Sequence, residues 1–300
     1  MGFRTVLIQS PCKLTYKDGF LILRGSTVRM VHLSEIHTLI IDSTMTSVTG
    51  YLICELMKEK INVIFCDEAR NPIGELHPCY GSHYASGRVI EQTKWQEARK
   101  DILWQYVIRR KILNQASLMR GIDVEAAAMI YGFAQDVGPG DPTNREGHAA
   151  KVYFNRIFGP EFSRNMKSNR NAALNYGYAI LLSAFNKEIT ARGYLTQLGI
   201  HHHSALNPFN LSSDLMEPFR AMIDRIVLDN GEREFGKEYK YTLLEVLNRE
   251  INYENSSMSV TTAIARYVRK TTDYLSGKAS LDESTVINVE GAADESDRHV

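Results

Sequence analysis

The sequence predicts an α+β protein in which an N-terminal β-rich domain is followed by a larger all-helical domain. The chain has 300 residues, which is more than one compact core usually takes. Short β-branched and aromatic runs fill about the first eighty residues, and from about Ser86 apolar residues recur at helical spacing. We therefore expect a β-rich domain at 1–85, a helical domain at 86–276 and an acidic tail at 277–300.

The strands expected in the first domain are short. They are the runs TVLIQS, KLTYK, FLILRG, TVRMVHL and HTLIID. Asp18-Gly19 separates the second run from the third, and this dipeptide is a strong hairpin signal. A helix is expected from about Val48 to Lys60, because its apolar residues fall at helical spacing. The run INVIFCD then predicts a buried strand, and Asn71-Pro72 predicts a turn.

The second domain should consist of helices joined by loops. Apolar residues keep helical spacing at 102–113, 172–189, 215–228, 241–251 and 259–275. Gly, Pro, Asn and Ser interrupt the pattern at 138–144, 159–160 and 207–213. From about Gly277 the chain is small, polar and acidic without sustained periodicity, which predicts a disordered tail.

The composition is that of an ordinary globular protein, with 44% hydrophobic and 23% charged residues. The sequence has no run of eighteen apolar residues and no apolar N-terminal stretch typical of a signal peptide, so we expect a cytoplasmic protein. Its four cysteines are widely spaced and form no CxxC pair, which argues against a zinc ribbon or a redox motif.

Charge is unevenly distributed along a chain whose net charge is zero. Residues 276–300 hold six acids and two bases, so the other 275 residues carry a net charge of +4. Between Arg145 and Arg192 there are eight Lys or Arg and three Glu. A local basic excess is what phosphate binding requires, although a solvated helix surface is the alternative explanation.

Candidate metal ligands stand in two segments. In the first, Asp141 as N-cap and Pro142 in the first helical position would start a helix and place Glu146 about one turn in. An acid there is favoured by the helix dipole, so a capping function is the alternative. The second segment holds His201, His202 and His203, followed by Asp214 and Glu217. The acids share a face if the segment is helical, but Pro218 leaves that geometry open.

Two carboxylates and an imidazole form a ligand set that suits Mg²⁺ or Mn²⁺. Such an ion can polarise a phosphodiester and stabilise the leaving oxygen. Three consecutive histidines cannot all face one site, so at most two of them are ligands.

A third segment, 163–178, is rich in groups that bind phosphates. Together with Arg145, it supplies six candidate DNA-binding residues, which are Arg145, Arg164, Lys167, Arg170, Asn175 and Tyr176. Basic and amide side chains could hold a DNA backbone, and a tyrosine could stack on an unpaired base. Core packing is the alternative for Tyr176, and for Tyr178 it is what we expect.

Taken together, these residues resemble the CRISPR-associated integrases of the Cas1 family, which insert new spacers into CRISPR arrays. The resemblance rests on REGHAAKVYF around Glu146, NAALNYGYAIL at 171–181, LGIHH at 198–202 and FNLSSDLMEPFR at 209–220. Their order and spacing extend the resemblance over residues 1 to 275. The compact length and the wording of the last two motifs are most similar to the type II form, which accompanies Cas9.

The resemblance implies that Glu146, His202 and Glu217 are catalytic residues that hold Mg²⁺ or Mn²⁺, with Asp214 as an auxiliary acid. Family members often have an aspartate in place of Glu217. It also implies homodimerisation through the β domain and assembly with the small protein Cas2. The expected substrates are a DNA duplex with single-stranded 3′ ends and CRISPR repeat DNA, joined by transesterification from a 3′-hydroxyl.

Two alternatives remain open from the sequence. A general metal-dependent nuclease for branched or free DNA would use the same ligands. A DNA-binding scaffold without enzymatic activity would use the same basic residues, with the His and Glu residues structural.

Overall fold

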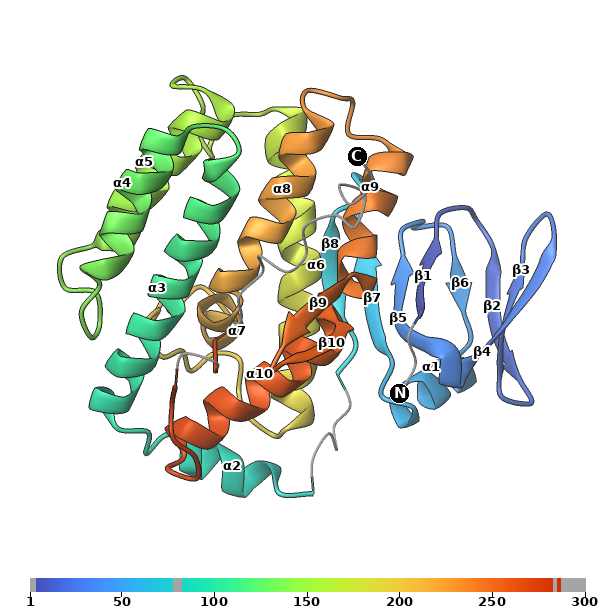
Figure 1. Ribbon diagram of the computed structural model, residues 1–300. Helices are drawn as coiled ribbons and strands as arrows, with labels where there is room; N and C mark the ends of the chain where they lie inside the picture. Colours follow the sequence, from blue (N-terminus) through green and yellow to red (C-terminus); the bar gives the residue numbers. More distant parts are fainter. Residues whose placement is uncertain (1–3, 78–82, 283–284, 287–300) are drawn as a thin grey trace. The chain divides into compact units, whose positions relative to one another are not determined.

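The structure, a computed structural model, describes residues 4–77, 83–282 and 285–286 (Figure 1). The chain divides into two compact units, Met1–His83 and Tyr84–Val300. The first contains strands and one α-helix, and the second is mainly helical, so the expected α+β class is confirmed. Of the tail expected to be disordered, residues 283–284 and 287–300 lie outside the described residues.

Two four-stranded sheets form the described part of the first unit. One has the order β1 (Arg4–Ile8), β5 (Ile36–Ile41), β7 (Asn62–Cys66), β8 (Pro72–Glu75), with the first two pairings parallel and the last antiparallel. The other has the order β4 (Val28–His32), β3 (Phe20–Arg24), β2 (Lys13–Lys17), β6 (Ser47–Val48), with only the last pairing parallel. The expected β2–β3 hairpin turns at Asp18 and Gly19, whose φ angles are +50° and +86°, as a tight two-residue turn requires.

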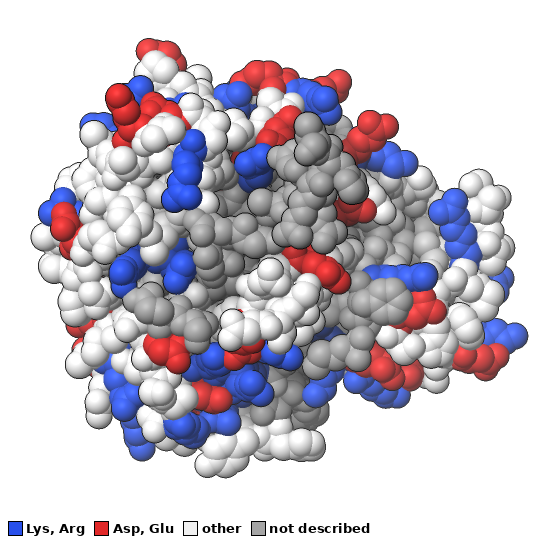
Figure 2. All heavy atoms as spheres, in the orientation of Figure 1, with Lys and Arg blue, Asp and Glu red and all other residues white. Residues whose placement is uncertain are grey.

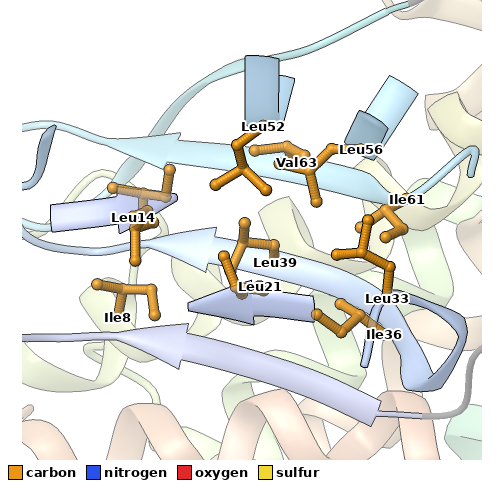
Figure 3. Close-up of a cluster of buried hydrophobic side chains, with 11 residues drawn as sticks. Ile8, Leu14, Leu21, Leu33, Ile36, Leu39, Leu52, Leu56, Ile61 and Val63 are labelled. Carbon is orange, nitrogen blue, oxygen red and sulfur yellow. The ribbon is translucent and has the colours of Figure 1, made fainter. Parts of the chain in front are cut away.

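The core of this unit lies between the two sheets and α1 (Gly50–Lys58). Figure 3 shows side chains from both sheets pointing toward one another beneath Leu52 and Leu56 of the helix. Leu14, Leu21 and Leu39 are fully buried there. A short 3₁₀-helix, η1 (Leu33–Glu35), adds Leu33 to the same cluster. Apolar side chains on the inward faces of the strands therefore hold the sheets together.

The second unit is a helical assembly with one small hairpin. Its helices are α2 (Ala85–Gln92), α3 (Glu97–Arg120), α4 (Val124–Gln135), α5 (Arg145–Phe158), α6 (Asn169–Ala191), α7 (Asn210–Leu215), η2 (Glu217–Phe219), α8 (Arg220–Asn230), α9 (Lys237–Leu244), η3 (Glu245–Asn248) and α10 (Val260–Leu275). Helix α3 packs against α4, α5 and α8, and α6 packs against α8, α9 and α10 (Figure 1). No helix in the described ranges is both long and apolar enough to cross a lipid bilayer.

Two sequence expectations for this unit were wrong in detail. The helix expected at 241–251 ends at Asn248, where strands β9 (Glu250–Tyr253) and β10 (Ser256–Ser259) form an antiparallel hairpin. Ile251 and Tyr253 are buried and alternate with exposed residues, which is the period of a strand. The helix expected at 215–228 is broken, because Pro218 lies in the 3₁₀-turn η2 between α7 and α8.

Candidate active site

Helix α5 carries Glu146 as its second residue. The helix begins at Arg145, and its N-cap is Asn144 rather than Asp141, so the expected start at Pro142 was wrong. Asn144 has φ +51°, a left-handed conformation that asparagine tolerates, and its side-chain oxygen accepts from the Gly147 N–H at 3.1 Å. Asp141 still contributes, since its carboxylate accepts from the N–H groups of Arg145 and Glu146 at 2.9 and 3.0 Å. The side chains of Asp141 and Asn144 thus fix the helix N-terminus that carries Glu146.

Glu217 opens the 3₁₀-turn η2, and its side chain is only 6% exposed. Pro218 fits the first turn of that short helix, where its missing N–H is of no consequence. The Pro218 carbonyl accepts a hydrogen bond of 2.8 Å from Asn114 on α3, which fixes the turn against that helix. Arg220 donates from Nε to Glu217 Oε1 at 2.9 Å. This contact uses one carboxylate oxygen of Glu217, and the other is Oε2.

Lys111 on α3 joins the two glutamates. Its Nζ lies 2.5 Å from Glu146 Oε1 and 2.6 Å from Glu217 Oε2. The second contact is an ion pair without hydrogen-bond geometry, because Oε2 accepts no hydrogen bond among the described residues. Sequence reasoning missed Lys111. The available signal was its place on the apolar face of α3, since Val107, Ile108 and Ile112 beside it are fully buried.

The electrostatics agree with a charged cluster. Burial acts to lower the pKa of Lys111, but Glu217 and Glu146 raise it above its usual value. Burial acts to raise the pKa of Glu217, but Arg220 and Lys111 hold it below its usual value. Lys111 and Glu217 are therefore both ionised near neutral pH, and the Glu217 carboxylate can bind a cation.

Asp214 on α7 organises the histidine loop. It is fully buried and accepts from the backbone N–H groups of Ile200, His201 and His202, at 2.8, 2.9 and 3.3 Å. Nδ1 of His202 also hydrogen-bonds to this carboxylate. A Cβ at position 199 would lie 2.7 Å from Asp214 Oδ2, which explains why the loop begins with Gly199. These hydrogen bonds fix the backbone of the histidine loop and the ring of His202 to Asp214.

The three histidines have different surroundings. His201 stacks on the Trp104 ring, with centroids 4.2 Å apart, and burial lowers its pKa. The hydrogen bond to Asp214 raises the pKa of His202, whose side chain is 47% exposed. Because Nδ1 of His202 faces the acid, Nε2 is the nitrogen left for a ligand. His203 is exposed and lines a cavity of about 730 Å³ together with Gln92 and Asn207.

A buried hydrogen-bond network centred on Asp224 lies next to Arg220 of the site. Tyr153 and Tyr178 both donate to the carboxylate of Asp224, with a distance of 3.0 Å from Tyr153 Oη. Two guanidinium groups lie near the Tyr178 ring, that of Arg220 at 4.6 Å and that of Arg164 at 5.3 Å from its centroid. The expectation that Tyr178 packs in the core is confirmed, because it is 8% exposed.

Most of the expected DNA-binding residues make contacts within the protein. Arg164 donates to Asn171 and Asn175 at 2.8 and 2.6 Å, and Arg170 pairs with Glu232 at 2.6 Å. Tyr176 is 1% exposed and packs against Phe235, so its ring offers no face for a base and that expectation is corrected. Tyr176 lies on the buried side of α6, although polar residues stand next to it in the sequence.

Arg145 and Lys167 are placed differently from the residues of α6. Arg145 lies 3.6 Å from Asp136 and its side chain is 29% exposed, while Lys167 is exposed. On the face shown in Figure 2, Lys and Arg side chains stand beside Asp and Glu and do not form one basic field.

The described residues contain no ready-made cluster of three His, Cys, Asp or Glu side chains in a metal-binding arrangement. Glu146 and Glu217 nevertheless meet at one cation, the ammonium of Lys111. The charges of both glutamates also act to raise the pKa of His202. Carboxylate oxygens that converge on a cation, with an imidazole nitrogen nearby, form a donor set that fits Mg²⁺ or Mn²⁺.

Comparisons with known proteins identify a family that this chain resembles. Residues 142–245 match the family described as CRISPR associated protein Cas1. The CRISPR-associated endonuclease Cas1 of Neisseria meningitidis serogroup C (strain 8013) is 35% identical to this chain over 277 residues, covering 89% of this chain and 90% of that protein.

Two solved structures have the same fold. A casposase bound to its integration product has a TM-score of 0.77 at 20% identity, over 96% of this chain and 95% of its own. A protein of a Cas6-RT-Cas1–Cas2 complex has a TM-score of 0.74 at 16% identity, over 95% of this chain and 36% of its own. At these identities the likeness concerns the fold alone.

Proposed function

Because this chain belongs to the Cas1 family of CRISPR-associated proteins, we propose that it is a divalent-metal-dependent DNA integrase and endonuclease of CRISPR adaptation. The relative from Neisseria meningitidis is named an endonuclease and is matched along nine-tenths of its length. The structural observation that carries the proposal is the convergence of Glu146 and Glu217 on one cation, within 2.5 and 2.6 Å.

The proposed metal ligands are Glu146, Glu217 and Nε2 of His202. When bound, Mg²⁺ or Mn²⁺ would polarise the scissile phosphodiester and acidify the attacking hydroxyl. Arg220 holds Oε1 of Glu217, which leaves Oε2 for the ion. Asp214 fixes the ring of His202 and the backbone that carries it, so that the ring need not reorganise when the site loads.

The proposed reaction is an exchange of phosphodiester bonds. A 3′-hydroxyl of the captured fragment attacks a phosphorus at the edge of a repeat, and one P–O bond forms while another breaks. The displaced 3′-oxygen takes up a proton, so the number of phosphodiesters is unchanged and no energy source is needed. With water as the nucleophile the same site would hydrolyse DNA, which is the endonuclease activity.

Partners follow from the same proposal. The chain would act as a homodimer joined through its N-terminal unit, together with Cas2, on duplexes with single-stranded 3′ ends and on repeat DNA. The fold likeness to a protein of a Cas6-RT-Cas1–Cas2 complex, and to a casposase bound to its integration product, supports both kinds of partner. Among the candidate DNA contacts we retain Arg145 and Lys167. Arg164, Arg170 and Asn175 we assign to holding the start of α6.

Strand transfer with a purified partner protein tests this function. The assay joins a labelled fragment to a plasmid that carries a repeat. Glu146→Gln and His202→Ala should each lower integration at least about 100-fold, because each removes a proposed ligand of the ion. Glu254→Gln is the matched control, since Glu254 forms ion pairs with Arg266 and Lys270 on α10, outside the site.

The target sequence separates integration from simple cleavage. A plasmid with a scrambled repeat should receive few insertions. Equal products on both plasmids without a partner protein would favour a general nuclease, and full integration by both site variants would contradict the proposed site.

A further inference from the structure

Lys111 is in an unusual position for a lysine. It lies on α3 between Ile108 and Ile112, which are fully buried, and its side chain is 11% exposed. An ammonium is costly to bury without compensating charge. The compensation here comes from Glu146 of α5 and Glu217 of η2, so three separate elements bring one cation and two carboxylates together.

Lys111 and Arg220 both neutralise the glutamates, but they differ in their other contacts. With both cations present, the two glutamates are neutralised. Arg220 is fixed by more than charge, because its guanidinium also lies 4.6 Å from the centre of the Tyr178 ring. Lys111 occupies the inner oxygens, Oε1 of Glu146 and Oε2 of Glu217. Those are the oxygens that a divalent ion bound between the glutamates would need.

An ammonium and a divalent ion cannot both sit on these oxygens. They would lie within a few ångströms of each other, where like charges repel strongly in a partly buried site. Lysine has a flexible stem of four carbons, and Glu146 is 25% exposed, so the cluster opens toward solvent on that side. Lys111 can therefore leave the pair, whereas Arg220 stays.

We propose that Lys111 is an internal counter-ion that neutralises the Glu146–Glu217 pair before metal binds and is displaced when the site loads. Lys111 thereby raises the concentration of divalent ion at which the enzyme becomes active. This inference rests on the proposed function, because it takes the two glutamates as metal ligands. It assigns to Lys111 control over the binding of the divalent ion to the two glutamates.

Direct metal binding to the full-length protein tests the proposal. Mn²⁺ titrations would be followed by the electron paramagnetic resonance signal of free Mn²⁺ for the wild type, Lys111→Met and Lys111→Arg. Removing the competing charge in Lys111→Met should tighten Mn²⁺ binding about 10-fold, within the usual range for coupled binding events. Lys111→Arg keeps the charge and should bind no more tightly than the wild type.

Lys270→Met is the matched control. Lys270 lies in the same unit and is 2.5 Å from Glu254, but it touches neither glutamate of the site. Its Mn²⁺ affinity should equal that of the wild type. Lys111→Gln is the second variant, because its amide can still bond to the carboxylates without carrying charge, and it should also bind more tightly.

The outcomes are separable. Unchanged or weaker Mn²⁺ binding by folded Lys111→Met or Lys111→Gln overturns the proposal, as does a failure of both to fold even with Mn²⁺. Variants that fold only when Mn²⁺ is added support it. If Glu146→Gln leaves Mn²⁺ binding unchanged in both the wild type and Lys111→Met, the metal site itself is wrong. If that binding depends on Glu146 but does not respond to Lys111, only the counter-ion inference fails.

Discussion

At the scale of single residues, Asp214 shows how one buried acid organises the loop that carries three histidines. Three backbone N–H groups and the ring of His202 converge on its two oxygens. Each of these donors would lose a hydrogen bond in a variant lacking the carboxylate, and buried donors are costly to leave unmet. The motif LGIHH is thus a structural unit, in which Gly199 admits the carboxylate and His202 is presented outward.

Asp224 leads to a prediction about pH. Burial raises its pKa from 3.8 to about 6, against the opposing effects of Tyr178 and Tyr153. The folded protein therefore binds this proton more tightly than the unfolded chain does. The resulting stabilisation is complete below about pH 4 and is lost as the pH rises through 6, by about 3 kcal/mol in total.

Substituting Asp224→Asn should remove that dependence. Other carboxylates titrate in the same range, so the informative quantity is the difference in unfolding free energy between wild type and variant, measured by urea denaturation at pH 4 and pH 7. This difference should shift by about 3 kcal/mol in disfavour of the wild type at pH 7. A difference that stays constant would mean that folding does not change the pKa of Asp224.

Sequence reasoning identified the acids and the histidine loop but not the lysine between them. Glu146, Glu217 and His202 stand in recognisable motifs, whereas Lys111 stands in an ordinary helical run, Arg109-Arg110-Lys111. Its importance depends on the approach of α5 and η2 to α3, which only the tertiary structure shows. The error over Tyr176 has a similar origin, because a polar neighbourhood in sequence does not determine which side of α6 faces the core.

At the scale of elements, helix periodicity predicted the long helices well and their ends poorly. Helices α6 and α10 match the expected ranges to within a few residues. The β9–β10 hairpin was missed because its tight turn uses Glu254 and Asn255 in left-handed conformations, with φ +53° and +59°. No glycine marks that turn, so the sequence carried no strong signal for it.

The start of α5 gives a testable case of the same effect. Asn144 serves as N-cap and also adopts φ +51°. Asn144→Ala loses the cap, and alanine tolerates the left-handed conformation less well than asparagine does, so it should cost about 2 kcal/mol of unfolding free energy. Asn144→Gly loses the same cap without the strain and should cost only about 0.5 kcal/mol. Chemical denaturation measures both, and equal losses would show that capping outweighs backbone strain.

At the scale of the whole molecule, the same fold serves a casposase bound to its integration product and a protein of a Cas1–Cas2 complex. Local basic charge lies between Arg145 and Arg192, yet several of those side chains are engaged within the protein. The net charge of that segment therefore overstates the number of groups free to bind phosphates. The proposed dimer would add the basic surface of a second copy.

The N-terminal unit offers a specific surface for that dimer. Strand β4 is at the edge of its sheet and exposes Val28 and Met30, at 67% and 54%. An edge strand with exposed apolar residues invites pairing with another chain. The double substitution Val28→Lys with Met30→Lys should convert the proposed dimer to a monomer in analytical ultracentrifugation, while Mn²⁺ binding is retained because the three proposed metal ligands belong to the other unit. Ile73→Lys on β8, at the edge of the other sheet, is the control because Ile73 is 73% exposed.

A dimer that survives the β4 substitutions but not Ile73→Lys would place the interface at β8 instead, and a dimer unaffected by either would exclude both sheet edges.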